Sequence, residues 1–156
     1  MKAPFRSIFC PTDLSPVGNL AVPVAYLLAS KGGTVHLAHV DAPPKTGNPL
    51  YPDEKPKGAP TAAQVEAARS AVRAKLQALV PPDAAARGVL TQVDLVEGED
   101  VPVASEAAAK EKRTDVVVLG SHGRWGVSRI VHADSVATRL LHRKDLDVSV
   151  VHTDRP

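Results

Sequence analysis

Short apolar runs alternate along the chain with longer segments in which apolar residues recur every three or four positions. Short runs bounded by turn residues are typical of strands, and the longer spacing is typical of helices. The apolar runs predict strands at residues 7–10, 34–40, 89–96, 116–119 and 148–152. The helical spacing, with its cap and proline signals, predicts helices at residues 15–30, 61–80, 102–112 and from 134 or 135 to 143.

Strands that alternate with helices indicate an α/β fold, here as a single domain over residues 1–156. The pattern predicts an open five-stranded parallel sheet with helices on both faces. Residues 41–60 form a proline-rich segment, which we expect to be an exposed loop because the elements on both sides continue one pattern. Open sheets bind ligands outside the carboxyl ends of their strands, so the segments after the first, second and fourth strands are candidates for a site.

The composition is that of a globular protein without a strong charge. Hydrophobic residues make up 44% of the chain, and 19 basic against 17 acidic residues give a net charge of +2. This balance provides no broad field for a polyanion or a membrane surface, and an aromatic content of 3% argues against a nucleic-acid stacking platform. With one cysteine, Cys10, and no apolar leader or spanning segment, we expect a cytoplasmic protein without an intrachain disulfide.

The strongest chemical signal is the glycine-rich turn at residues 120–126, Gly-Ser-His-Gly-Arg-Trp-Gly, directly after an apolar strand. Glycines let backbone amides approach a ligand, and successive amides beside a helix N-terminus form a nest for anions. Ser121 and Ser135 add hydroxyl donors, and Arg124 and Arg129 add cations that suit phosphate oxygens. The turn is not a P-loop, because no Gly-Lys-Ser/Thr follows. A plain loop between a strand and a helix is the alternative.

Three segments resemble the universal stress protein family: residues 7–15 (Ser-Ile-Phe-Cys-Pro-Thr-Asp-Leu-Ser), 35–40 (Val-His-Leu-Ala-His-Val) and 115–136. The run Thr-Asp-Val-Val-Val-Leu-Gly-Ser-His-Gly-Arg is highly specific to that family, and the resemblance covers nearly the whole chain. It implies a Rossmann-like sheet of the adenine nucleotide alpha hydrolase type with strand order 3-2-1-4-5. It also implies ATP or a related adenine nucleotide as the ligand, with or without Mg²⁺.

The family's nucleotide site can be carried over to this chain position by position. Asp13 would accept a hydrogen bond from the adenine amino group, Pro11 and Thr12 would line that pocket, and Val40 would meet the ring. The residues that would surround the ribose and phosphates are Gly120, Ser121, His122 and Gly123, with Arg124, Trp125, Gly126 and Val127 beside them. Ser135 and Val136 would offer amides and a hydroxyl to the phosphates.

The phosphate end departs from the family's pattern. ATP-binding members carry Gly, two residues, Gly, nine residues, then Gly and Ser/Thr, whereas this chain has Ala133 and Asp134 at the last two positions. A shift of one residue aligns Ser135-Val136-Ala137 with the family's Ser-Val-Ala but supplies no third glycine. The Asp134 carboxylate could cap the following helix, and it would repel phosphate unless Mg²⁺ bridges the two.

Three functions stay open. The first is a stress-response regulator that binds an adenine nucleotide and, as the resemblance implies, forms a homodimer through the strand at residues 148–152. The second is an interaction protein of the same fold with a degenerate phosphate site, and the third is a slow ATPase. No residue is assigned a catalytic role, because Ser121-His122 lacks the nucleophile-elbow pattern. The histidine spacing matches no zinc pattern, so no metal site is expected.

Overall fold

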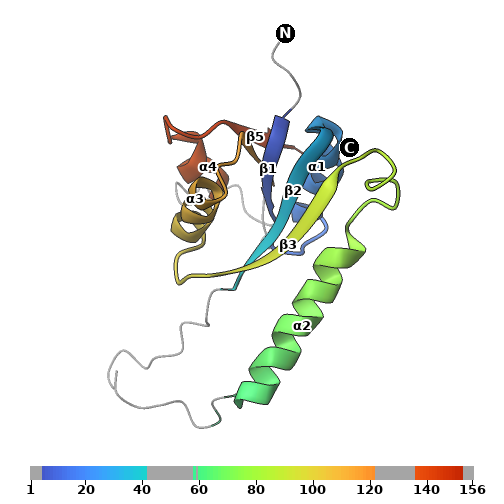
Figure 1. Cartoon of the computed structure of the whole chain (residues 1–156). Coiled ribbons are helices and arrows are strands. Elements are labelled where there is room, and N and C mark those ends of the chain that lie inside the picture. The colour runs from blue at the N-terminus through green and yellow to red at the C-terminus, as the bar shows by residue number, and fades with distance from the viewer. Residues whose placement is uncertain (1–4, 42–57, 59, 122–135, 153–156) are drawn as a thin grey trace.

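The computed structural model describes residues 5–41, 58, 60–121 and 136–152. It contains a five-stranded parallel sheet in the order β3-β2-β1-β4-β5, which confirms the expected α/β class and strand order (Figure 1). The strands are β1 (Phe5–Pro11), β2 (Ala29–Asp41), β3 (Leu90–Glu97), β4 (Val116–Gly120) and β5 (Val148–Val151). The helices are the 3₁₀ turn η1 (Gly18–Leu20), α1 (Ala21–Leu28), α2 (Ala62–Ala78), α3 (Val101–Glu111) and α4 (Val136–Leu141).

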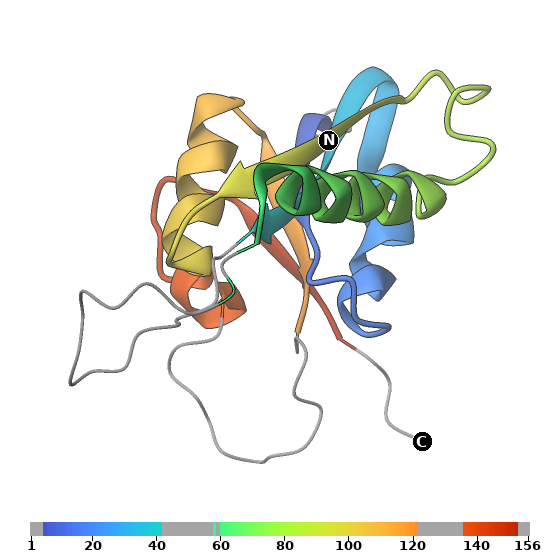
Figure 2. The same cartoon turned by 90° about the horizontal axis from the view of Figure 1, so that it is seen from below.

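Alternation along the central strands divides the apolar core between the two faces of the sheet. Ile8 and Cys10 of β1 pack toward α1 and α2, whereas Phe9 packs toward α3 and α4. The buried valines and leucine of β4 alternate in the same way, as expected for successive side chains of a strand. Helices α1 and α2 therefore cover one face and α3 and α4 the other, which Figure 2 shows from below.

The expected first helix, residues 15–30, is wrong at both ends. The chain makes the turn η1 first, and α1 begins at Ala21, because the Ser15 hydroxyl bonds to the side chain of Asp13 and to the amide of Gly18 within the preceding loop. Pro23 falls in the first turn of α1, where its missing N–H would have no intrahelical partner. At the other end Ser30 belongs to β2, where its hydroxyl donates to the Phe5 carbonyl at 3.0 Å.

The start of α2 agrees with the local sequence signals. The Thr61 hydroxyl accepts from the Gln64 amide at 3.2 Å, and the Gln64 side chain accepts from the Thr61 amide at 2.8 Å. This capping box satisfies two donors that a helix N-terminus leaves free. Of the residues of α2, Leu76 is the buried one, so the helix touches the sheet mainly through its C-terminal half.

Asp115 ties the beginning of β4 to the beginning of β1. Its Oδ2 accepts from the amides of Arg6 at 2.7 Å and Ser7 at 2.9 Å, and its own amide donates to the Ser7 carbonyl at 2.7 Å. These bonds set the alignment of two neighbouring strands before their ladder begins at Ile8 and Val116. Asp115, which belongs to the run Thr-Asp-Val-Val-Val-Leu-Gly-Ser-His-Gly-Arg, therefore has a structural role.

Other expectations concern the membrane, the cysteine and the proline-rich loop. Within the ranges that the structure describes, no helix is long and apolar enough to cross a membrane. Cys10 is fully buried, and burial raises the pKa of its thiol to about 12, so the thiol stays protonated at neutral pH. Most of the loop expected at residues 41–60 lies outside the described residues.

The buried Ser105 of α3 leads to a prediction about the stability of the fold. Its side chain is 0% exposed, and its hydroxyl has no hydrogen-bond partner among the described residues. A buried hydroxyl without a partner is unfavourable, so we predict that Ser105→Ala raises the free energy of unfolding by about 1 kcal/mol. Urea denaturation measures the change, and Ser70→Ala at an exposed position of α2 gives the contribution of helix propensity alone. A lower unfolding free energy for Ser105→Ala would show that the hydroxyl is paired.

Candidate functional site

The carboxyl ends of β2, β1 and β4 lie next to one another, because these parallel strands are neighbours in the sheet. From β1 the chain continues to β2 on one side, while β4 lies on the other side, so the strand order reverses here. Open α/β sheets bind their ligands at such a switch point. Residues 11–13 at the end of β1, Val40 near the end of β2, and Gly120 with Ser121 at the end of β4 all lie at this edge.

Thr12 anchors the loop that leaves β1. It is 6% exposed, and its amide continues the ladder to β2 by donating to the Ala38 carbonyl at 2.8 Å. Its hydroxyl donates to Asn19 Oδ1 at 2.8 Å and accepts from the Leu14 amide at 3.0 Å. His39 Nδ1 lies 2.9 Å from the Thr12 carbonyl oxygen, and because a carbonyl only accepts, this ring nitrogen carries the proton. The loop is thus held from both β2 and its own turn.

Asp13 has one carboxylate oxygen fixed by the loop and one that bonds to none of the described residues. Oδ1 accepts from the Ser15 amide at 3.0 Å and from the Ser15 hydroxyl at 2.5 Å. Oδ2 is buried and has no hydrogen-bond partner among the described residues. Leu14, between Asp13 and Ser15 in the chain, adopts a left-handed conformation with φ of 64°, which tightens the turn. The carboxylate therefore has a defined orientation and one acceptor that the described part of the chain leaves unused.

Two glycines bring this loop into contact with the end of β4. A Cβ on Gly120 would lie 2.9 Å from the Val17 carbonyl oxygen and 3.2 Å from Gly18 Cα, so a side chain there would displace the backbone. A Cβ on Gly18 would in turn overlap the Asp13 carboxylate and approach the Ser15 hydroxyl at 3.1 Å. The absence of both side chains lets the Asp13 loop pack directly against β4.

The remaining described residues of the site lie on either side of this contact. The Ser121 amide donates to the Val151 carbonyl at 2.9 Å, so the pairing with β5 continues one residue beyond β4. Val40 is 8% exposed and pairs with Val96 of β3. Little of the Val40 side chain is therefore accessible to a ligand at this edge.

The chain matches the model of the universal stress protein family over residues 4–152. It belongs to the universal stress protein family. Solved structures show the same fold, while no curated protein sequence matches the chain. A universal stress protein in complex with cAMP is 21% identical, with a TM-score of 0.66 and coverage of 97% of this chain and 100% of that one.

Two further structures with the family fold come from named bacteria. Universal stress protein UspA from Lactobacillus plantarum is 20% identical, with a TM-score of 0.64 and coverage of 96% of this chain and 99% of its own. A universal stress family protein from Burkholderia pseudomallei is 24% identical, with a TM-score of 0.63 and coverage of 97% and 98%. At these identities the likeness establishes the fold shared with universal stress proteins.

Part of the expected nucleotide site falls outside the described residues. These positions are His122, Gly123, Arg124, Trp125, Gly126, Val127 and Ser135. Val136 is described as the first residue of α4, where it packs against the core that α3 and α4 share. The described part of the site accordingly contains all the residues that the family resemblance assigns to the adenine base, and Gly120, Ser121 and Val136 of those it assigns to ribose and phosphates.

The structure adds residues to the site that the sequence alone did not indicate. Ser15 bonds to Asp13, and His39 Nδ1 bonds to the Thr12 carbonyl oxygen, so both residues hold the Thr12–Asp13 turn. Gly18 also belongs to the site, because it lies against the Asp13 carboxylate. The Asp-x-Ser spacing is a known turn signal and could have indicated Ser15, whereas contacts of Gly18 and His39 depend on the folded sheet.

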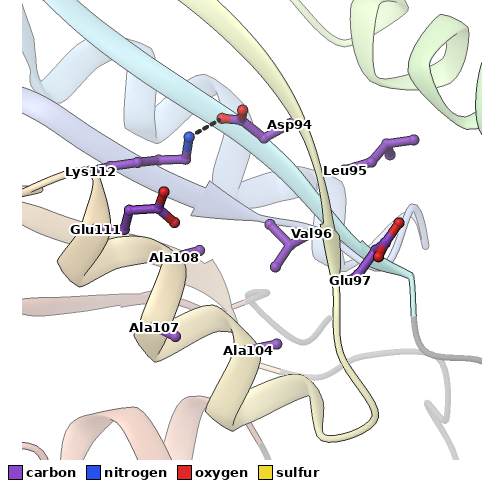
Figure 3. Close-up of a pocket in the computed structure, with 9 residues that line it drawn as sticks. All are labelled: Asp94, Leu95, Val96, Glu97, Ala104, Ala107, Ala108, Glu111 and Lys112. Atoms are coloured by element: carbon purple, nitrogen blue, oxygen red, sulfur yellow. Dashed lines mark ion pairs between the residues drawn. The ribbon is translucent and has the colours of Figure 1, made fainter.

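A separate cavity of about 340 Å³ lies between β3 and α3 and shares no residue with the expected nucleotide site (Figure 3). The side of α3 that faces β3 carries alanines, which are too short to fill the space opposite Val96. Lys112 Nζ reaches across to Asp94 Oδ2 at 3.1 Å, and both side chains are more than four-fifths buried. This ion pair joins the end of α3 to the edge strand.

His36 of β2 lies next to the Lys112–Asp94 ion pair. It is 8% exposed, and its Nδ1 is 3.5 Å from Asp94 Oδ2. Burial lowers the pKa of His36, and the Lys112 charge lowers it further, against the opposing effect of Asp94. The imidazole is therefore neutral at pH 7.

The lowered pKa of His36 predicts a loss of stability in mild acid. The unfolded chain binds the proton near the ordinary His pKa of 6.5, whereas the folded chain binds it only at lower pH. The contribution of neutral His36 to the free energy of unfolding is therefore complete above pH 6.5 and declines below it. We expect the free energy of unfolding to fall by at most about 1.4 kcal/mol per pH unit from this group. Denaturation of the wild type and His36→Gln between pH 7 and 5 measures it. Parallel pH profiles for the two proteins would contradict the assignment.

Proposed function

We propose that this chain binds an adenine nucleotide at the carboxyl ends of β1, β2 and β4 and acts as a stress-response regulator. The observation that carries the proposal is the Asp13 carboxylate, whose Oδ1 is held within its loop while Oδ2 is buried without a partner among the described residues. A buried acceptor without a donor is unfavourable, and the exocyclic amino group of adenine supplies a donor. Pro11, Thr12 and Val40 would border the ring.

The family fold supports the same class of ligand. The universal stress protein crystallised with cAMP holds an adenine nucleotide within a fold of TM-score 0.66 to this chain. For this chain we infer ATP, because the family resemblance assigns the turn that begins at Gly120 and Ser121 to ribose and phosphates. His122, Gly123 and Arg124 follow at the positions that the resemblance gives to the phosphates. A Mg²⁺ ion carried by the nucleotide would offset the repulsion between phosphate and Asp134.

We infer a regulatory role in preference to a catalytic one. The polar groups of the Asp13 loop bond to one another and leave an acceptor for a base, which suits binding and supplies no activated water. Slow hydrolysis of ATP is the most that we expect. A single domain over residues 1–156 and a cytoplasmic location stay predictions.

Calorimetric titration with ATP and Mg²⁺ tests the nucleotide site. We expect the wild type to bind and Asp13→Ala to bind at least about tenfold more weakly, because the base amino group loses its acceptor. Absence of heat with the wild type at millimolar ATP would refute the proposal. Asp134→Gly is the companion variant: if ATP binds to this variant and not to the wild type, the interaction protein with a degenerate phosphate site is the correct function.

We also propose a homodimer through β5, as the family resemblance implies. Val148 and Val150 are half-buried on the strand that ends the described sheet. The carbonyls of Asp147 and Val151 accept bonds from β4, so alternation turns the backbone N–H and C=O of Val148 and Val150 away from it. An apolar edge with outward backbone groups favours pairing with another strand.

The β5 edge predicts how the oligomeric state responds to proline. Val150→Pro removes one outward N–H without removing a bond to β4, so we expect a dimer to become a monomer. Val150→Thr keeps the N–H and should remain dimeric. Light scattering after size exclusion gives the mass, and circular dichroism checks that each variant is folded. A wild-type monomer, or a dimer unaffected by Val150→Pro, would exclude this interface.

A further inference from the structure

We propose that Ser15 is a positioning residue that holds the Asp13 carboxylate so that the site prefers a 6-aminopurine to a 6-oxopurine. The inference rests on the proposed nucleotide site and assigns its base selectivity to a residue outside the expected set. Ser15 itself makes no contact with the base. It acts through the orientation of Asp13.

The hydrogen bonds of the Ser15 hydroxyl determine where its proton goes. Ser15 Oγ accepts from the Gly18 amide at 3.0 Å, and the same oxygen lies 2.5 Å from Asp13 Oδ1. An amide can only donate, so the single hydroxyl proton is available for the carboxylate. The Ser15 amide adds a second donor to Oδ1 at 3.0 Å. Oδ1 is therefore supplied with two donors from one residue.

Gly18 leaves open the space that the Asp13 carboxylate occupies. A Cβ at this position would overlap Asp13 Oδ1 and come within 3.2 Å of the Thr12 hydroxyl oxygen, so the carboxylate occupies space that only glycine leaves open. Gly18 is buried and is packed in turn against Gly120. The backbone of β4 thus supports the loop from behind and limits its movement.

The orientation leaves Asp13 Oδ2 as the oxygen that can take a donor from a ligand. It is buried, so bulk water does not satisfy it, and it has no partner among the described residues. An amino group at the purine 6 position places an N–H there, whereas a 6-oxo group places a second lone pair against the carboxylate. Sites built around such a polar contact reject the analogue that lacks the donor. Because Oδ2 is buried, a ligand can bond to it only when the atoms that cover this oxygen move aside.

Paired titrations with ATP and ITP, which differ at the purine 6 position, test the inference. For the wild type we expect ATP to bind at least about tenfold more tightly than ITP. Ser15→Ala frees the carboxylate to turn and should reduce that ratio about tenfold, mainly by weakening ATP. Ser15→Thr keeps the hydroxyl and should restore the ratio. Ser30→Ala is the matched control, because its hydroxyl bonds to the Phe5 carbonyl at the opposite end of β1.

The outcomes separate this inference from the proposed function. If the wild type binds neither nucleotide, the nucleotide site is wrong and the inference fails with it. If the wild type binds ATP but Ser15→Ala weakens ATP and ITP equally, Ser15 only supports the fold and the inference alone fails. If Ser15→Ala does not fold, Ser15→Cys replaces it, since the thiol has similar size and is a weak donor. An unchanged ratio in Ser15→Cys would equally overturn the inference.

Discussion

Strand β1 is buried on both faces, and the arrangement of the other elements depends on this burial. Ile8 and Cys10 require apolar cover from one helical layer and Phe9 from the other, so helices must lie on both sides of the sheet. Parallel neighbours are joined by crossovers that return the chain to the same end of the sheet. The carboxyl ends of β2, β1 and β4 consequently share one edge, and the loop after β1 comes into contact with the end of β4.

At that edge the geometry is set mainly by backbone packing. Gly18 and Gly120 remove the side chains that would separate the loop after β1 from the end of β4. The same loop carries Asp13, whose Oδ1 is bonded to Ser15, so the close backbone approach also determines where the carboxylate lies relative to the end of β4. The Asp13 carboxylate and the end of β4 are thereby kept at a set separation.

The most family-specific run of the chain serves two purposes. Its first residues are structural, since the Thr114 hydroxyl bonds to the Ala109 carbonyl at the end of α3 and Asp115 aligns β4 with β1. Its apolar residues fill both cores, and its first glycine allows the contact with the Asp13 loop. A motif can therefore be specific to a family because the fold and the site depend on adjacent residues of the same segment.

The fold class follows from local patterns, because strand and helix periodicity and caps such as Thr61 act over a few residues. Pro11, Thr12, Asp13 and Gly120 could likewise be selected from the sequence, through strand ends and family resemblance. Only the tertiary structure decided what Ser15 does: its hydroxyl is as suitable for capping a helix as for binding Asp13, and the approach of Gly18 to the carboxylate favours the second. The contacts of Gly18 with Gly120 and of His39 with Thr12 join segments that are distant in the chain, so they exist only once the sheet has brought those segments together.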